Sequence, residues 1–306
     1  MPKFQKNNIM EWDVNDLALD TLKLVELCDF QYDRNIEDVA EGIAAQVAEK
    51  PLIMLSGPSA SGKTTTANLL AKKLTDMGVP AQVVSLDDFY LGPARCPRRE
   101  DGTIDFETVF ALDVVLCNRC LQQLLNEGEA VFPIYDFVTK ERAKQTKTIT
   151  LPKGGAVIVE GLHALNPILT SGIIGHYATV YTTAMDRYIG KHEILKTNDI
   201  RLIRRLVRDL KHRNIGAAET VDMWHDVCYG EAAYIKPYRS DCDYYVNSSF
   251  WYEPGLYTPY LQEVANTTPY PQRGRVEKLL EKLEPFVPVD VSFVKKDAMI
   301  REFIGE

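Results

Sequence analysis

Residues 57–64 read Gly-Pro-Ser-Ala-Ser-Gly-Lys-Thr, and this stretch constrains the fold more than any other part of the chain. It matches the phosphate-loop pattern G-x-x-x-x-G-K-[ST]. The apolar run 52–55 precedes it and a helical pattern over 65–74 follows, in the strand, loop and helix order that this loop requires. The glycines let the backbone curl so that N–H groups face phosphate oxygens, and the helix N-terminus adds partial positive charge.

The loop therefore predicts a nucleoside triphosphate site. Lys63 is expected to reach the β- and γ-phosphates, and the Thr64 hydroxyl is expected to bind Mg²⁺. The residues that we expect to contact the nucleotide are Gly57, Ser59, Ala60, Ser61, Gly62, Lys63, Thr64 and Thr65.

The composition describes an ordinary soluble chain. Its 306 residues carry a net charge of −8, which argues against a nucleic acid polymer as partner, because such binding needs a broad basic face. No apolar run approaches the ~20 residues of a membrane span, and residues 1–8 lack the apolar core of a signal peptide. We therefore expect a cytoplasmic protein with no membrane partner, and whether it forms a homo-oligomer is left open.

Strands and helices are predicted to alternate from residue 52 to residue 247. This alternation is typical of an α/β fold with a parallel sheet covered by helices on both faces, here of the P-loop NTPase type. Segments 130–137 and 147–151 read as an antiparallel hairpin inserted into that sheet, flanking a basic connection. We predict a helical extension over residues 1–50, the P-loop domain over 51–250, and a helical and irregular extension over 251–306, with a helix at 275–286 and a Pro-containing, strand-like piece after it.

Two acidic residues follow predicted strands. Asp87 comes after the strand 81–86, and Glu160 ends the strand 156–159. Ligands of open α/β sheets bind at the carboxyl ends of strands, so Asp87 is a candidate proton acceptor and Glu160 is a candidate Mg²⁺ ligand with Thr64. The alternatives are that Asp87 caps a turn and that Glu160 is an ordinary strand-end residue.

A cationic helix is predicted around residues 201–213, which contain Arg201, Arg204, Arg205 and Arg208. It could close over the site as a lid that stabilises the charge of a transferring phosphoryl group. The alternative is a solvated face paired with Asp199, Asp209 and Glu219.

Five motifs, in order, resemble those of the uridine kinase / phosphoribulokinase family. They are Gly57–Thr65, Ser85–Tyr90, Pro133–Phe137, Val159–Gly161 and Arg204–Asp209, and together they cover about residues 50–250. The bacterial branch of the family also resembles this chain in the segments 160–167, 230–238 and 301–305.

The resemblance implies a small-molecule kinase that uses ATP or GTP with Mg²⁺ and phosphorylates a nucleoside 5′-hydroxyl. It implies a catalytic base at Asp87 and a metal site at Thr64, Asp87 and Glu160. The candidate catalytic set is therefore Asp87, Lys63, Arg205 and Arg208, with Arg213 as a further arginine on the nucleotide. The candidate acceptor-binding set is Asp87, Tyr90, Glu107, Tyr135, Lys140, Arg142 and Arg205.

Three positions depart from the family pattern. Lys140 stands where uridine–cytidine kinases have a histidine that reads the pyrimidine edge, Ile215 replaces a lid arginine, and Met223 replaces a glutamine on the ribose side. The sequence thus predicts phosphorylation of a hydroxyl of a small metabolite, with uridine or a related nucleoside as first choice. The alternatives are a different acceptor (a sugar phosphate, pantothenate or glycerate) and a nucleotide-binding regulatory protein with little transfer activity.

Overall fold

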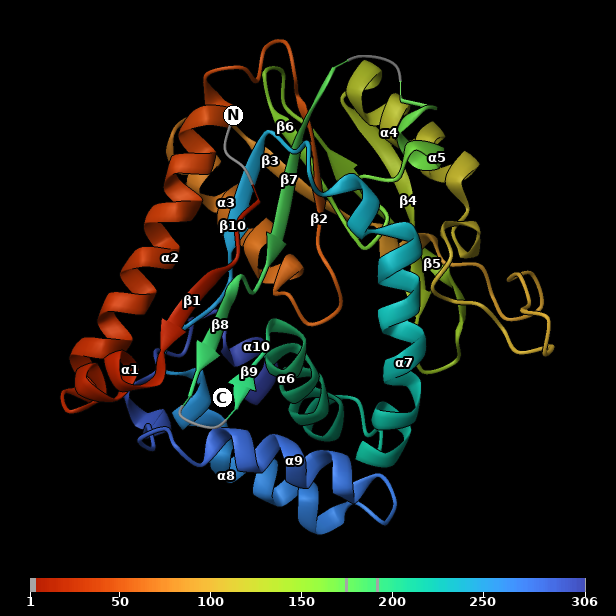
Figure 1. Cartoon of the computed structure of the whole chain (residues 1–306). Coiled ribbons are helices and arrows are strands. Elements are labelled where there is room, and N and C mark those ends of the chain that lie inside the picture. Colours follow the sequence, from red (N-terminus) through yellow and green to blue (C-terminus); the bar gives the residue numbers. More distant parts are fainter. Residues whose placement is uncertain (1–3, 174–175, 191–192, 306) are drawn as a thin grey trace.

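The computed structural model describes residues 4–173, 176–190 and 193–305, and its centre is a five-stranded parallel sheet (Figure 1). The strand order is β10-β7-β2-β6-β3, which confirms the predicted α/β fold. In chain order the strands are β2 (Leu52–Ser56), β3 (Ala81–Ser85), β6 (Ala156–Glu160), β7 (Tyr177–Thr183) and β10 (Tyr244–Asn247).

The central strands β2 and β6 are buried at every position, and apart from their last residues, Ser56 and Glu160, they are apolar. On one face Ile53 and Ile158 pack with α2 (Thr21–Ala44) and α3 (Lys63–Asp76). On the other, Met54 and Val159 pack with α4 (Val114–Glu127). Continuous apolar runs are what a strand covered on both sides requires.

The inserted hairpin is longer than predicted. It pairs β4 (Glu129–Asp136) with β5 (Glu141–Thr150), so the expected basic connection is itself strand and the turn is confined to residues 137–140. The hairpin extends beyond the core, and much of β5 is exposed on both faces. The apolar alternation that marks a half-buried strand is therefore missing from 141–147.

The N-terminal segment contains two helices and one strand that was not predicted. Helix α1 (Glu11–Ala18) and α2 follow β1 (Asn7–Met10), which pairs in parallel with β8 (Asp186–Ile189). With β9 (Ile194–Leu195) these strands form a small second sheet. The contact partners lie 179 positions apart, so no local pattern indicates the pairing.

Two helices connect the last strands of the main sheet. Helix α6 (Thr197–His212) contains the arginine cluster, and α7 (Ala217–Tyr234) packs against it. Four short elements complete this part of the chain: α5 (Pro167–Thr170) and the 3₁₀ turns η1 (Leu86–Phe89), η2 (Val109–Ala111) and η3 (Lys236–Tyr238).

The C-terminal segment lies beyond the carboxyl ends of the strands (Figure 1). It consists of α8 (Glu253–Thr267), α9 (Arg273–Leu283), the turn η4 (Val291–Phe293) and α10 (Arg301–Ile304). The predicted helix at 275–286 is α9, but the expected strand-like piece after it is wrong, because residues 284–290 form no strand. Helix α8 was not predicted, since Pro254, Gly255 and Pro259 read as helix breakers; Pro254 is tolerated in the first turn, where its missing N–H has no helical partner.

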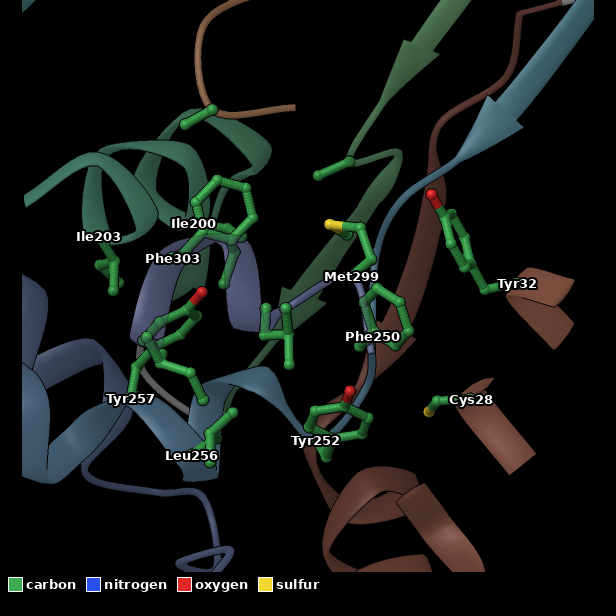
Figure 2. Close-up of a cluster of buried hydrophobic side chains, with 14 of the residues drawn as sticks. Cys28, Tyr32, Ile200, Ile203, Phe250, Tyr252, Leu256, Tyr257, Met299 and Phe303 are labelled. Carbon is green, nitrogen blue, oxygen red and sulfur yellow. The ribbon is translucent and has the colours of Figure 1, made fainter. Parts of the chain in front are cut away.

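Residues from all three predicted segments contribute to one apolar core. Figure 2 shows Tyr32 of α2, Leu256 and Tyr257 of α8, Met299, and Phe303 of α10 in one cluster that extends from α2 to α6. The division of the chain at residues 50 and 250 stays a prediction, and it does not coincide with a boundary of this core. Within the described residues, no helix is long and apolar enough to cross a membrane.

Candidate active site

The phosphate loop runs from the end of β2 to the start of α3, as predicted. Gly62 has φ +79°, in the left-handed region that favours glycine, and it is the residue before the first turn of α3. At Gly57, a Cβ atom would lie 2.1 Å from the backbone oxygen of Thr182, so only glycine fits there. The two motif glycines are thus required by backbone conformation and by close packing against β7.

Lys63 lies across this loop. Its Nζ donates a hydrogen bond to the Pro58 carbonyl oxygen at 3.1 Å. Burial lowers the pKa of Lys63, while the nearby carboxylates of Glu160 and Asp87 oppose that effect. The ammonium group is therefore close to both predicted acids, although they come from other strands.

The carboxyl ends of β2, β3 and β6 bring the metal candidates together. Glu160 lies beside Leu55 of β2 and Ser85 of β3 in the sheet register. Its buried Oε1 accepts a hydrogen bond from Ser85 Oγ at 2.7 Å and a weaker one from Thr64 Oγ1 at 3.4 Å. The Thr64 hydroxyl and the Glu160 carboxylate thus face each other at the mouth of the loop.

Asp87 lies in the turn that follows β3. Burial raises the pKa of Asp87, and the cations Lys63 and Arg213 oppose the rise. The pKa of Glu160 is also raised, by burial and then by the charge of Asp87. Two neighbouring acids that resist ionisation form a set of oxygen ligands that a divalent cation would stabilise in the charged form.

These oxygen ligands fit Mg²⁺ better than a transition metal. Among the described residues, no group of three or more His, Cys, Asp or Glu side chains could hold a metal on its own. Mg²⁺ sites in phosphoryl-transfer enzymes commonly use one or two carboxylates and complete the shell with water and substrate phosphates. Thr64, Asp87 and Glu160 match that pattern.

The arginines of α6 hold the phosphate loop. Arg201 Nε donates to the Ser59 carbonyl oxygen at 2.8 Å, Arg204 Nη1 donates to that of Ala60 at 3.3 Å, and Arg205 Nη1 donates to Ser59 Oγ at 3.0 Å. Arg201 and Arg204 are buried and form ion pairs with Glu231 and Glu253.

The alternative of a solvated arginine face is therefore wrong, although the pairing with Asp209 that it included is present for Arg205 and Arg208. Helix α6 packs against α7, α8 and α10, which leaves little of its surface exposed. The acids that neutralise Arg201 and Arg204 lie 30 and 49 positions away in the sequence, so local charge pairing could not identify them.

Asp209 lies at the centre of the remaining candidate arginines, Arg205, Arg208 and Arg213. Its fully buried carboxylate accepts hydrogen bonds from Arg208 Nη2 at 2.8 Å, Arg205 Nε at 3.3 Å and Thr220 Oγ1 at 3.2 Å. Arg213 Nε lies 3.9 Å from the same carboxylate. Burial, followed by the charge of Arg208, lowers the pKa of Arg213. Arg205 thus contacts both the loop and Asp209.

Aromatic and acidic side chains lie on the Asp87 side of the loop. The rings of Tyr90 and Tyr135 are 5.7 Å apart between centroids, and Asp88 anchors the hairpin by accepting from Lys147 Nζ at 2.6 Å. Burial raises the pKa of Glu107 to about 7, an effect that Arg205 opposes. Tyr90 therefore lies near Asp87, Glu107 and Tyr135, and Arg205 lies near Glu107.

Two further predicted acceptor contacts, Lys140 and Arg142, come from the hairpin, where Arg142 lies opposite Tyr135 in the strand register. Lys140 is exposed at the hairpin turn with φ +56°. Arg142 forms an ion pair with Asp113, the N-cap of α4, through Nη2 and Oδ2 at 3.3 Å. Their role in acceptor binding stays a prediction.

Sequence reasoning missed the C-terminal contribution to the loop. Thr65 Oγ1 donates to Glu302 Oε2 at 2.5 Å, and a Cβ atom on Gly62 would lie 2.6 Å from the Met299 sulfur. Thr65 thus has a carboxylate partner where a nucleotide phosphate was predicted. The signal that could have identified this region is the resemblance in residues 301–305, which carried no assigned role.

Comparison with known proteins agrees with this geometry. The sequence model of the Phosphoribulokinase / Uridine kinase family matches residues 52–249, which span the sheet, the loop and α6. The chain belongs to the phosphoribulokinase / uridine kinase family. It is thus a P-loop kinase, of the class that transfers a phosphoryl group to a hydroxyl acceptor.

Individual relatives of this family are distant. A uridine kinase of Saccharomyces cerevisiae is 30% identical over 196 residues, covering 63% of this chain and 36% of its own length. A uridine kinase of Oceanobacillus iheyensis is 25% identical over 197 residues, covering 64% of this chain and 85% of its own length.

A solved structure shares the fold. The protein from Silicibacter sp. TM1040 named a "putative fructose transport system kinase" superposes with a TM-score of 0.52 at 21% identity, over 69% of this chain and 98% of that one.

Proposed function

We propose that this kinase transfers the γ-phosphoryl group of ATP or GTP to the 5′-hydroxyl of uridine or a related nucleoside. The observation that carries the proposal is the position of Asp87. Its carboxyl group lies close to Lys63, and among the charged neighbours of Asp87 the Lys63 ammonium has the largest effect on the Asp87 pKa. A carboxylate next to the phosphate loop can hold an acceptor hydroxyl in line with the terminal phosphate and take its proton.

The other residues of the site have separate roles in this proposal. Lys63 and the loop amides bind the triphosphate, and Arg205 and Arg208 stabilise the charge of the transferring group. Thr64, Asp87 and Glu160 would hold Mg²⁺, whose chemistry is to neutralise charge on the β- and γ-phosphate oxygens when bound. The hydrogen bonds from α6 to the loop support the exclusion of water, which would otherwise compete as acceptor.

The residues proposed to bind the phosphoryl acceptor are suited to a nucleoside. Tyr90 and Tyr135 offer aromatic surface to a base, and Glu107 can accept hydrogen bonds from ribose hydroxyls when it is ionised. The relatives named uridine kinase point to the same substrate class.

A different small acceptor is the second candidate, and specific positions favour it. The side chain of Lys140 is exposed and makes no hydrogen bond or ion pair with the described residues. Ile215 and Met223 also lack the polar groups that the nucleoside-specific members of the family carry at these positions. A sugar phosphate, pantothenate or glycerate would not need those contacts.

The test is an acceptor screen read by ³¹P NMR, in which purified chain and Mg·ATP are incubated separately with uridine, cytidine, a sugar phosphate, pantothenate and glycerate. We expect a nucleoside 5′-monophosphate from uridine or cytidine, and none with the Asp87→Asn variant. A product from one of the other acceptors alone would establish the second candidate. ATP binding without any product would overturn both.

A further inference from the structure

A second concave site lies on the outer side of the phosphate loop. The cavity has a volume of about 230 Å³ and is lined by Pro58 of the loop, Tyr181 and Thr183 at the carboxyl end of β7, and Phe4 near the N-terminus. Six cationic residues also line it: Lys6, Arg187, Lys196, Arg201, Lys236 and Arg239. No acidic residue is among its lining residues, within the ranges 4–173, 176–190 and 193–305.

Four of these cations lack a carboxylate partner. Arg201 and Lys236 both pair with Glu231, which is buried beside the cavity. Across the described part of the chain, no acid lies within ion-pair distance of the other four, Lys6, Arg187, Lys196 and Arg239. Arg187 donates to the neutral Asn8 side chain, and the Arg239 guanidinium lies 4.6 Å from the Phe4 ring centroid.

This concentration of charge is unusual for a chain with a net charge of −8. Partial burial and then the charges of Arg239, Lys236, Arg187 and Arg201 lower the pKa of Lys6. The positive charges of the neighbouring side chains thus disfavour the protonated form of Lys6. A bound anion would relieve that repulsion, and lysines and arginines that converge on one concave site are the usual means of binding phosphate groups.

We propose that this pocket binds a compact phosphate-bearing anion, at a site separate from the phosphate loop. The cavity is smaller than the ~300–1,000 Å³ of typical ligand pockets, so it suits a pyrophosphate or a small phosphate ester rather than a nucleoside triphosphate. Guanidinium groups supply bidentate hydrogen bonds to phosphate oxygens, and the lysines supply point charges.

The pocket is physically connected to the loop. Arg201 lines the cavity and also donates to the Ser59 carbonyl oxygen at 2.8 Å, and Pro58 belongs to both. An anion in the pocket would compete with Glu231 for the Arg201 guanidinium. The inference stands on these contacts alone and does not depend on the identity of the phosphoryl acceptor.

The test is isothermal titration calorimetry of the full chain with inorganic pyrophosphate at constant ionic strength and without Mg²⁺. The Lys63→Ala background weakens the phosphate loop and isolates the pocket. There we expect one saturable site, and the double variant Lys6→Gln/Arg187→Gln is expected to weaken it at least tenfold. Both substituted side chains are exposed, and Lys196→Gln provides an independent single variant.

The matched control is Lys153→Gln/Lys278→Gln, which removes the same two charges from exposed positions outside the pocket. We expect this control to change the dissociation constant less than twofold. Inorganic phosphate and glycerol 3-phosphate, titrated in parallel, distinguish a condensed phosphate from a phosphate ester. Absence of saturable binding for all three anions, or equal weakening by the pocket and control pairs, would overturn the proposal.

Discussion

Arg204 and Glu253 form an ion pair in which both side chains are fully buried, and the pair joins α6 to α8. Arg204 Nε donates to Glu253 Oε2 at 2.8 Å, and the same guanidinium reaches the Ala60 carbonyl oxygen in the phosphate loop at 3.3 Å. The C-terminal segment is thus linked through one side chain to the loop that binds phosphate.

Glu253→Gln should strongly destabilise the fold, because it leaves the buried Arg204 charge without its partner. Breaking a buried pair in this way costs about 3–5 kcal/mol. Urea denaturation measures the change. Glu37→Gln, which removes one of the two acidic partners of the exposed Arg34, is the control and should cost about 1 kcal/mol or less. Equal costs for the two variants would contradict the structural role given to the buried pair.

Asp87→Asn should remove most phosphoryl transfer while sparing nucleotide binding. Loss of a positioned general base lowers turnover by about 10²- to 10⁴-fold. Initial rates with the acceptor found in the screen test this, and calorimetry with an ATP analogue should show affinity within a few-fold of wild type. Asp76→Asn, on the exposed end of α3, controls for the chemical change and should leave the rate unaltered. A near-normal rate for Asp87→Asn would exclude Asp87 as the base.

Glu107 should make folding stability depend on pH in a defined window. Burial raises its folded-state pKa from 4.5 to about 7, so the folded state favours the protonated carboxyl group. The stabilisation of the folded state by the protonated Glu107 is fully present below pH 4.5 and is lost as the pH rises from 4.5 to about 7. Above pH 7 the free energy of unfolding no longer changes through this group. We therefore expect the free energy of unfolding of wild type to fall relative to that of Glu107→Gln as the pH rises through this window, as measured by urea denaturation from pH 4 to 8. A flat difference would contradict the buried environment of Glu107.

Comparing Gly62→Ala with Gly78→Ala separates the cost of a left-handed backbone conformation from the cost of a steric clash of the added Cβ atom. Both glycines have positive φ, +79° and +86°, so both variants lose stability of about 1–2 kcal/mol from the backbone alone. A Cβ on Gly78 meets nothing within 4 Å, whereas on Gly62 it would lie 2.6 Å from the Met299 sulfur. We expect Gly62→Ala to lose about 1–3 kcal/mol more and to bind an ATP analogue at least tenfold more weakly. Thermal denaturation and calorimetry provide the two readouts, and indistinguishable variants would show that Met299 does not pack on the loop.

Local sequence patterns were sufficient for the sheet and the loop. The strands around Ile53 and Ile158 are continuous apolar runs, and Gly57 and Gly62 are identified by their spacing ahead of Lys63. The strands are recognised from runs of consecutive apolar residues, and the loop is recognised from a local motif. They can therefore be predicted before any tertiary contact is known.

The contacts that complete the site could not be predicted in the same way. Glu253 and Glu302 have no local signal, because each acts on a residue 49 or 237 positions away. The arginines of α6 were identified, but only the tertiary contacts with α8 and α10 rule out the alternative of a solvated face. Helix α8 was missed because its prolines indicate a break when read without the core that stabilises it.

The docking of residues 298–305 also has a consequence for how the chain folds. The Thr65–Glu302 hydrogen bond closes a loop of 237 positions, and contacts of such long range form slowly because the chain entropy is lost before they are made. The phosphate loop can assemble its local turn early, but it reaches its final surroundings only after α10 has docked. The ability to bind a nucleoside triphosphate should therefore appear among the last events of refolding, later than the formation of the parallel sheet.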